Sequence, residues 1–178
     1  MLFEGFELLR LEPGMDIKPF DCENADLNGF LFDDAERFSK ELLATTFIIQ
    51  SESETVAYFN YLNDKISHHE IGGNKDKFIQ RISSLLPLGK DGFTSYPAVK
   101  IGRLAVSKNF KGRGIGREIL NFTKQLFVDN NRTGCKFITV DAYRESLEFY
   151  KKNGFEYLSS RDKKSDTRLM YFNLEIIN

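Results

Sequence analysis

The first half of the chain carries hydrophobic patterns that are typical of β-strands. Phe6–Leu11 predicts a first strand, which ends ahead of Pro13 and Gly14. Thr45–Gln50 is rich in β-branched and aromatic residues, and Thr55–Leu62 alternates apolar and polar positions after a short polar turn. Because such runs on either side of a turn favour pairing, we expect these two segments to form a hairpin.

Two short helices, Asp26–Phe32 and Asp34–Leu43, are predicted between the first strand and this hairpin. Asn24 and Asp26 are both suitable N-caps, because their side-chain oxygens can accept hydrogen bonds from the free amides at the start of a helix. The first half of the chain therefore combines strands with helices.

The second half begins with a polar connection, residues 64–97, in which Lys75–Leu85 predicts one helix. A strand over Lys100–Val106 follows it. The next helix has an apolar stripe at spacings typical of a surface that packs on a sheet, formed by Ile115, Ile119, Phe122 and Leu126. The remaining predicted elements are a strand over Cys135–Val140, a helix over Ser146–Lys152, and strands over Phe155–Ser159 and Arg168–Leu174.

Strand runs at both ends of the chain thus surround a β-α-β-α-β middle. This order is typical of an α+β fold with a sheet of mixed direction and helices on its faces. The 178 residues suit a single domain over residues 1–178, and no repeat, linker or low-complexity tract divides them.

Composition excludes several classes of protein. Hydrophobic residues make up 41%, with 17 Phe and no Trp, which predicts a Phe-rich core and no general disorder. No apolar stretch approaches the roughly 20 residues that span a bilayer, and no signal-peptide pattern is present, so we expect a cytoplasmic protein without a membrane association. Cys22 and Cys135 lack metal-ligand spacing, and the adjacent His68 and His69 cannot share one face, so no metal site is expected.

Charge is unevenly distributed along the chain. Residues 1–107 hold 11 Lys and Arg against 17 Asp and Glu, whereas residues 108–168 hold 14 against 8. The basic part contains the candidate phosphate loop described next, where cations favour a polyanionic ligand. A solvated face and a nucleic-acid substrate are alternative interpretations of this excess.

The segment Lys111–Gly116 reads Lys-Gly-Arg-Gly-Ile-Gly and lies between a strand and a helix. Its glycines leave backbone N–H groups free to face an anion, and the positive end of the helix dipole points to the same place. The dinucleotide fingerprint fails because Arg117 stands where its last glycine belongs. The triphosphate loop fails because Gly116 is followed by Arg-Glu rather than by Lys-Ser or Lys-Thr. A glycine-rich turn without a ligand remains the alternative.

This segment resembles the pyrophosphate loop of the GCN5-related N-acetyltransferases (GNAT), written Gln/Arg-x-x-Gly-x-Gly/Ala. Gly114 and Gly116 match it, and Lys111 stands where the family usually has Gln or Arg. The resemblance implies the GNAT fold, which is a mixed, mostly antiparallel twisted sheet with helices on both faces. It also implies acetyl-CoA as acetyl donor, with its pantetheine arm along the backbone of Leu104–Val106. The acetyl-CoA-binding residues that it implies are Leu104, Ala105, Val106, Lys111, Gly112, Arg113, Gly114, Ile115, Gly116 and Arg117.

A second block, Ala142–Phe155, resembles the helix and following strand of the same family, in which a tyrosine is trailed by Gly-Phe. By this resemblance Tyr150 is the catalytic acid that protonates the leaving thiolate. A phenol of pKa about 10 is a poor proton donor to a thiolate whose thiol has a pKa near 8.5. Tyr150 would therefore contribute mainly through its position beside the sulfur. The alternative is a core tyrosine whose hydroxyl donates to a carbonyl.

A general base is less evident. No Asp or Glu lies within Ala98–Val106, and Asp141, after the next predicted strand, is equally suited to a cap or turn. An α-amine with a pKa of about 7.7–8.0 can react unassisted, whereas a lysine near 10.4 would be mostly charged. The sequence therefore favours an α-amine acceptor.

A narrower resemblance links four parts of the chain to the acetyltransferase toxins of bacterial toxin–antitoxin modules: Phe20–Leu31, Ala35, Gly102–Val106 and the segment from Val140 to Tyr150. Those toxins acetylate the amino group of aminoacyl-tRNA, are restrained by a ribbon-helix-helix antitoxin and are commonly dimers. An alternative interpretation of Phe20–Leu31 is a capped helix that only packs on the core.

Three hypotheses follow. The first is an N-acetyltransferase that moves the acetyl group directly to a primary amine on a small molecule or peptide. The second is the toxin version, with aminoacyl-tRNA as acceptor, an antitoxin partner and a homodimeric state. The third, from another class, is a non-catalytic acyl-CoA-binding module.

Overall fold

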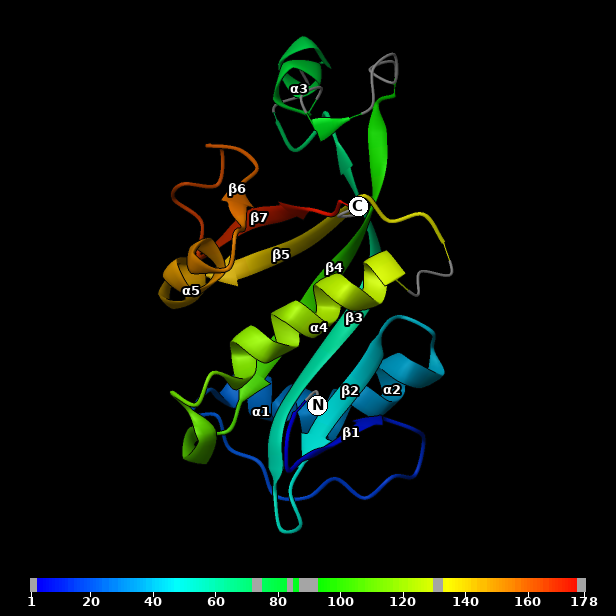
Figure 1. Cartoon of the computed structure of the whole chain (residues 1–178), viewed down its shortest axis with the longest axis vertical. Helices are drawn as coiled ribbons and strands as arrows, with labels where there is room; N and C mark the ends of the chain where they lie inside the picture. The colour runs from blue at the N-terminus through cyan, green and yellow to red at the C-terminus, as the bar shows by residue number, and fades with distance from the viewer. Residues whose placement is uncertain (1–2, 72–74, 83–84, 87–92, 130–132, 176–178) are drawn as a thin grey trace. The chain divides into compact units, whose positions relative to one another are not determined.

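A computed structural model describes residues 3–71, 75–82, 85–86, 93–129 and 133–175. In these residues seven strands form one mixed sheet in the order β1-β2-β3-β4-β5-β7-β6 (Figure 1), which confirms the predicted fold class. The chain forms two compact units: the residues up to Leu62 with Ile101–Gln125, and Asn63–Lys100 with the residues from Leu126 on. The long strands β3 and β4 contribute residues to both.

The first unit is built on an antiparallel meander. β1 (Glu7–Arg10) pairs with β2 (Thr45–Gln50), which pairs with β3 (Thr55–Ser67), so the predicted hairpin is present. β4 (Ser95–Val106) follows β3 in the sheet order.

Helical residues between β1 and β2 differ from the prediction of two separate helices. α1 (Ala25–Gly29), a π-helical segment (Phe30–Asp34) and α2 (Ala35–Lys40) follow one another directly. Asn24 is the N-cap of α1, since its Oδ1 accepts a hydrogen bond from Leu27 N at 3.0 Å. The wider π turn joins the two helices where a break was expected, because Ala35 N–H donates to Phe30 O.

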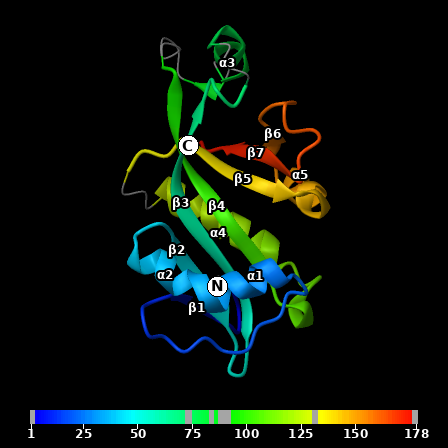
Figure 2. The same cartoon turned by 180° about the vertical axis from the view of Figure 1, so that it is seen from behind.

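The two faces of the sheet in this unit are covered by different helices. α4 (Ile115–Asp129) lies on one face, where Phe122 packs on Phe59 and the buried Thr123 hydroxyl lies 2.6 Å from Tyr61 Oη. α1 and α2 lie on the opposite face (Figures 1 and 2). The core under α1 and α2 consists of Leu11, Phe20, Cys22, Phe30, Leu31, Ala35, Ile48, Tyr58 and Ala105.

The second unit contains the C-terminal strands. β5 (Phe137–Tyr143) pairs antiparallel with β7 (Thr167–Asn173), and β6 (Glu156–Tyr157) also pairs with β7. α5 (Leu147–Lys152) and α3 (Lys75–Ile82) belong to this unit. Its core consists of Ile66, Ile82, Tyr96, Ala98, Phe137, Leu158 and Tyr171.

Several predicted boundaries in this unit were wrong. The connection 64–97 is shorter than expected, because β3 extends to Ser67 and β4 already begins at Ser95. Polar residues fit in these strands because they pair with one another: Lys100 Nζ lies 3.9 Å from Asp64 Oδ2, which also accepts a hydrogen bond from Thr139 Oγ1. The strand predicted over Cys135–Val140 runs from Phe137 to Tyr143, and residues 83–84 of the predicted helix lie outside the described residues.

Two absences hold for the described residues. None of their helices is both long and apolar enough to cross a membrane. They also contain no group of three or more His, Cys, Asp or Glu side chains arranged to hold a metal ion.

Candidate functional site

The predicted phosphate loop joins β4 to α4 through a short 3-10 turn, Lys108–Phe110. Gly112 and Gly114 have φ of +78° and +82°, a region that L side chains rarely adopt. A Cβ built on either glycine meets no atom within 4 Å, so the loop surface beside them is open. The sequence therefore forms a bare turn with room for a ligand against its backbone.

α4 begins at Ile115, directly after this turn. The first amides of a helix have no intrahelical acceptor, and the helix dipole adds positive potential there. The Ile115 side chain is buried at 5% exposure, so this residue offers only its backbone to a ligand, whereas Arg113 and Arg117 are exposed. Open glycines, helix amides and exposed cations fit the diphosphate of acetyl-CoA.

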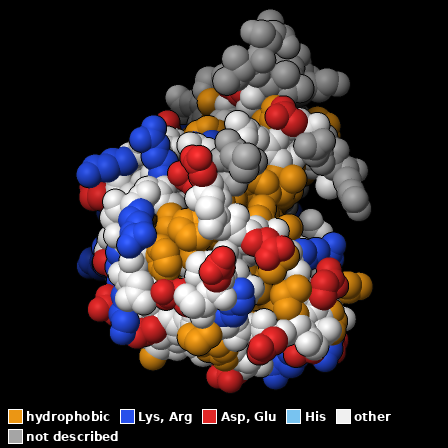
Figure 3. Space-filling view, turned by 60° about the horizontal axis from the view of Figure 1, so that its bottom comes forward, with side chains coloured by type: hydrophobic (Ala, Val, Ile, Leu, Met, Phe, Trp, Pro, Cys, Tyr) orange, Lys and Arg blue, Asp and Glu red, His pale blue; other side chains and the backbone are white. Residues whose placement is uncertain are grey.

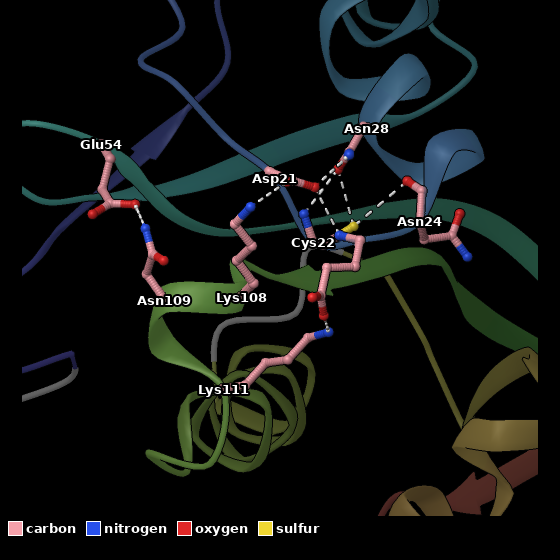
Figure 4. Close-up of polar contacts among 9 residues, drawn as sticks. Asp21, Cys22, Asn24, Asn28, Glu54, Lys108, Asn109 and Lys111 are labelled. Carbon is pink, nitrogen blue, oxygen red and sulfur yellow. Dashed lines mark hydrogen bonds and ion pairs between the residues drawn. The ribbon is translucent and has the colours of Figure 1, made fainter.

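Acidic residues of the segment before α1 form ion pairs with one lysine of the loop and one lysine of the 3-10 turn before it (Figure 4). Lys111 Nζ lies 2.6 Å from Glu23 Oε2, and Lys108 Nζ lies 2.8 Å from Asp21 Oδ2. Lys111 was predicted as an acetyl-CoA-binding residue, and in the structure its ammonium group pairs with Glu23. Arg113 pairs with no acid among the described residues, and its guanidinium carbon lies 4.9 Å from the centroid of the Phe110 ring.

Asp21 fixes the segment before α1 to the loop. Its carboxylate accepts hydrogen bonds from Lys108 Nζ, from the Glu23 amide at 2.8 Å and from Asn28 Nδ2 at 2.9 Å. These hydrogen bonds hold the pKa of Asp21 well below its ordinary value, and the bond from Lys108 contributes most. The Lys108 amide also donates to Asp21 O at 2.8 Å, so side chains and backbone both join the two segments.

The strand segment predicted to hold the pantetheine arm, Leu104–Val106, ends β4. Ala105 is buried, so only its backbone is available, and Leu104 and Val106 are partly buried. The residue before this segment, Arg103, is held by β3, because Asn60 Oδ1 accepts a hydrogen bond from the Arg103 amide at 2.8 Å. Sequence reasoning missed Asn60 and Arg103 as site residues, although a buried Asn in an apolar strand is a usable signal.

Tyr150 lies in the second unit, on α5, and is 5% exposed. Its ring contacts Phe149 and Phe155 with centroid distances of 5.1 and 5.3 Å. Among the described residues its hydroxyl has no hydrogen-bond partner, which argues against the alternative of a tyrosine bonded to a carbonyl. Burial raises the pKa of the Tyr150 phenol, so the hydroxyl keeps its proton at ordinary pH.

Asp141 lies within β5 rather than in a cap or turn. Its Oδ2 accepts a hydrogen bond from Lys100 Nζ at 2.7 Å, and the same ammonium group is near Asp64. The contact therefore favours a structural role for Asp141.

Charged side chains of both signs are interspersed on the face shown in Figure 3. The described part of this face carries no continuous basic stripe of the kind that nucleic-acid-binding surfaces often have. At the loop itself, the first amides of α4 and the exposed side chains of Arg113 and Arg117 supply positive charge.

A model of the acetyltransferase (GNAT) domain matches residues 51–176 of the chain. The match includes β4, the glycine loop, α4 and Tyr150. The chain belongs to the GNAT acetyltransferase family. As a GNAT protein it is an acetyl-CoA-dependent N-acetyltransferase, and acetyl-CoA is its acetyl donor.

Solved structures share the fold of this GNAT protein, while no curated protein matches its sequence. A tyrosine-to-phenylalanine mutant of KacT is 18% identical, with a TM-score of 0.75 over 96% of each chain. AtaT complexed with acetyl-methionyl-tRNAfMet is 19% identical, with a TM-score of 0.73 over 94% of each chain. A tyrosine-to-phenylalanine mutant of the AtaT toxin, bound to the C-terminus of the antitoxin AtaR and acetyl-CoA, is 18% identical, with a TM-score of 0.69 over 96% of this chain and 94% of the other.

Proposed function

We propose that this GNAT enzyme transfers the acetyl group of acetyl-CoA directly to a primary amine, with Tyr150 protonating the departing sulfur. The observation that carries the proposal is the open turn at Gly112 and Gly114 ahead of α4. Acetyl-CoA supplies an acetyl group that its thioester activates for attack by an amine.

The chain's own residues have separate roles in this reaction. The backbone amides from Gly112 to Arg117 bind the diphosphate, and the guanidinium groups of Arg113 and Arg117 add positive charge. The backbone of Leu104–Val106 aligns the pantetheine arm, and one of its N–H groups polarises the acetyl carbonyl. One such donor contributes about 2.7–4 kcal/mol to the stabilisation of a transition state.

Tyr150 supplies the proton for the leaving group. As the nitrogen–carbon bond forms and the carbon–sulfur bond breaks, the Tyr150 Oη–H donates to the sulfur. The former amine nitrogen loses one proton as it becomes an amide, and this proton returns to the Tyr150 phenolate through solvent. Its buried site supports this role, because the raised pKa keeps the proton on Oη until negative charge develops beside it.

The acceptor amine has to arrive without its extra proton. The strand β4 carries no Asp or Glu, and Asp141 is occupied by Lys100. An α-amine with a pKa of about 7.7–8.0 is substantially neutral at physiological pH, whereas a lysine side chain is not. We therefore favour an α-amine acceptor.

Aminoacyl-tRNA is the second candidate acceptor, since it carries an α-amine. It is supported by the fold shared with AtaT, which was solved with acetyl-methionyl-tRNAfMet and, as a mutant, with part of the antitoxin AtaR. In this version the chain is a toxin that acts in the cytoplasm, is restrained by an antitoxin partner and forms a homodimer.

The test measures thiol release from acetyl-CoA with a panel of free amino acids, polyamines, peptides and charged tRNA. We expect transfer to at least one α-amine, and a loss of about 10²- to 10⁴-fold in kcat for Tyr150→Phe. The affinity of the same variant for CoA, measured by calorimetry, should be unchanged. CoA binding without turnover on any acceptor would instead support a non-catalytic acyl-CoA-binding module.

A further inference from the structure

An arginine on β4 carries hydrogen-bond donors that the described residues do not use. The guanidinium carbon of Arg103 lies 3.8 Å from the ring centroid of Phe30, a buried residue of the π-helical segment. No described residue accepts a hydrogen bond from the Arg103 side chain or forms an ion pair with it, and its Nε is buried without a partner. The side chain as a whole is partly buried.

Neighbouring strands fix the position of Arg103 and add polar groups beside it. Asn60, 1% exposed, binds the Arg103 amide through Oδ1 at 2.8 Å. Thr46 is the register partner of Asn60 on β2, and its hydroxyl is fully buried without a hydrogen-bond partner in the described structure. Thr46, Asn60 and Arg103 therefore place polar groups on three adjacent strands, in a unit whose core under α1 and α2 is otherwise apolar.

Packing does not account for this arrangement. A cation over an aromatic ring is favourable, but the Nε–H of this guanidinium is removed from water without a partner, which costs free energy. A methionine would cover Phe30 equally well without that cost. The unpaired donors at Arg103 are explained more simply if they serve a ligand.

We propose that Arg103 recognises an oxyanion on the acceptor and thereby determines acceptor specificity. The proposal rests on the proposed acetyl transfer, because Leu104–Val106, the segment assigned there to the acetyl donor, follows Arg103 directly. A planar guanidinium forms paired hydrogen bonds with a carboxylate or a phosphate. The oxyanion is either the α-carboxylate of a free amino acid or the phosphodiester of an aminoacyl nucleotide.

Binding of matched probe pairs to the full chain in the presence of CoA tests this inference by calorimetry. The first pair is leucine and leucinamide, which differ in the carboxylate. The second pair is a leucyl amide of 3′-amino-3′-deoxyadenosine with and without a 5′-linked cytidine phosphodiester. We expect the wild type to favour the oxyanion-bearing member of one pair by about 10- to 100-fold, and which pair shows the preference identifies the source.

Substitutions at Arg103 separate recognition from packing. Arg103→Met keeps the apolar stem over Phe30 and should abolish the preference while affinity for the uncharged probes stays unchanged. Arg103→Lys keeps the charge without the planar guanidinium and should retain only part of the preference. Arg37→Met is the matched control, since it removes the same charge from α2, where Arg37 pairs with Asp34, and should keep the preference.

Two results would overturn the inference: equal or undetectable binding of both members in both pairs by the wild type, or a preference that survives in Arg103→Met. Circular dichroism confirms that each variant is folded. Acetylation of leucinamide by the wild type is measured in parallel. A binding preference without acetylation of any probe would contradict the proposed function and leave the recognition by Arg103 standing. Acetylation without a preference would contradict recognition by Arg103 and leave the proposed function standing.

Discussion

Substitution of Gly114 tests whether the bare turn ahead of α4 binds the diphosphate of acetyl-CoA. Gly114 has φ +82°, and a Cβ added there meets no atom within 4 Å. The Gly114→Ala and Gly114→Glu variants therefore strain the backbone but clash with nothing in the protein. Both side chains extend into the open space where we place the diphosphate.

The magnitudes predict a folded protein that binds poorly. An L residue in this conformation costs about 1–2 kcal/mol, against a typical stability of about 5–15 kcal/mol. A carboxylate about 4 Å from a phosphate charge is repelled by roughly 1 kcal/mol in water and about 4 kcal/mol at an effective dielectric of 20. We therefore expect Gly114→Glu to weaken CoA binding by about 5- to 1,000-fold, and Gly114→Ala to lie between it and the wild type.

Gly14 provides the matched control, because its φ is +79° and a Cβ there also meets nothing within 4 Å. Gly14→Ala and Gly14→Glu should lose as much stability as the Gly114 variants in urea unfolding, yet bind CoA like the wild type in calorimetry. Unchanged CoA affinity in Gly114→Glu, or an equal loss in Gly14→Glu, would refute the assignment of the loop.

Three further predictions concern stability. Gly102→Ala should cost about 1–3 kcal/mol in urea unfolding, because the new Cβ would lie 2.6 Å from Asn60 Oδ1; an unchanged midpoint would contradict this contact. Asp21→Asn should be less stable than the wild type at pH 7. The difference should begin to shrink as the pH falls below the ordinary carboxyl pKa of 3.8 and disappear only below the depressed native pKa, because a depressed native pKa stabilises only the ionised form. A pH-independent difference would exclude the ion pair with Lys108 as its cause. Tyr150→Phe should keep the wild-type Tm, since its hydroxyl has no partner in the described structure, and a large drop would indicate a structural role instead.

Local patterns predicted the elements whose residues determine their own conformation. The stripe on α4 and the β2–β3 hairpin follow from spacing and β-branched residues, and both are present. The continuous α1–α2 segment was not predictable in the same way. Its π turn over Phe30–Asp34 depends on the packing of Phe30 and Leu31 into the core under these helices, which periodicity along the chain does not reveal.

The same distinction between local and long-range contacts applies to the candidate site residues. The glycines of the loop were predictable, because positive φ and open space are properties of the turn itself. The contacts of Arg103 with Asn60 and Phe30 join three segments far apart in the sequence, and they depend on the register of β3 and β4. The polar residues at the end of β3 misled the sequence interpretation because their partners, Lys100 and Thr139, lie on other strands.

The ion pairs around the loop change how the basic excess of residues 108–168 is understood. Lys108 and Lys111 contribute to that excess, yet acidic residues of the segment before α1 hold both ammonium groups. In the proposed assignment, phosphate binding then depends mainly on backbone amides, which do not contribute to the count of charged side chains, and on Arg113 and Arg117. Removal of Glu23 by Glu23→Gln should free Lys111 and leave CoA binding equal or tighter, whereas a marked loss of affinity would show that this ion pair shapes the loop.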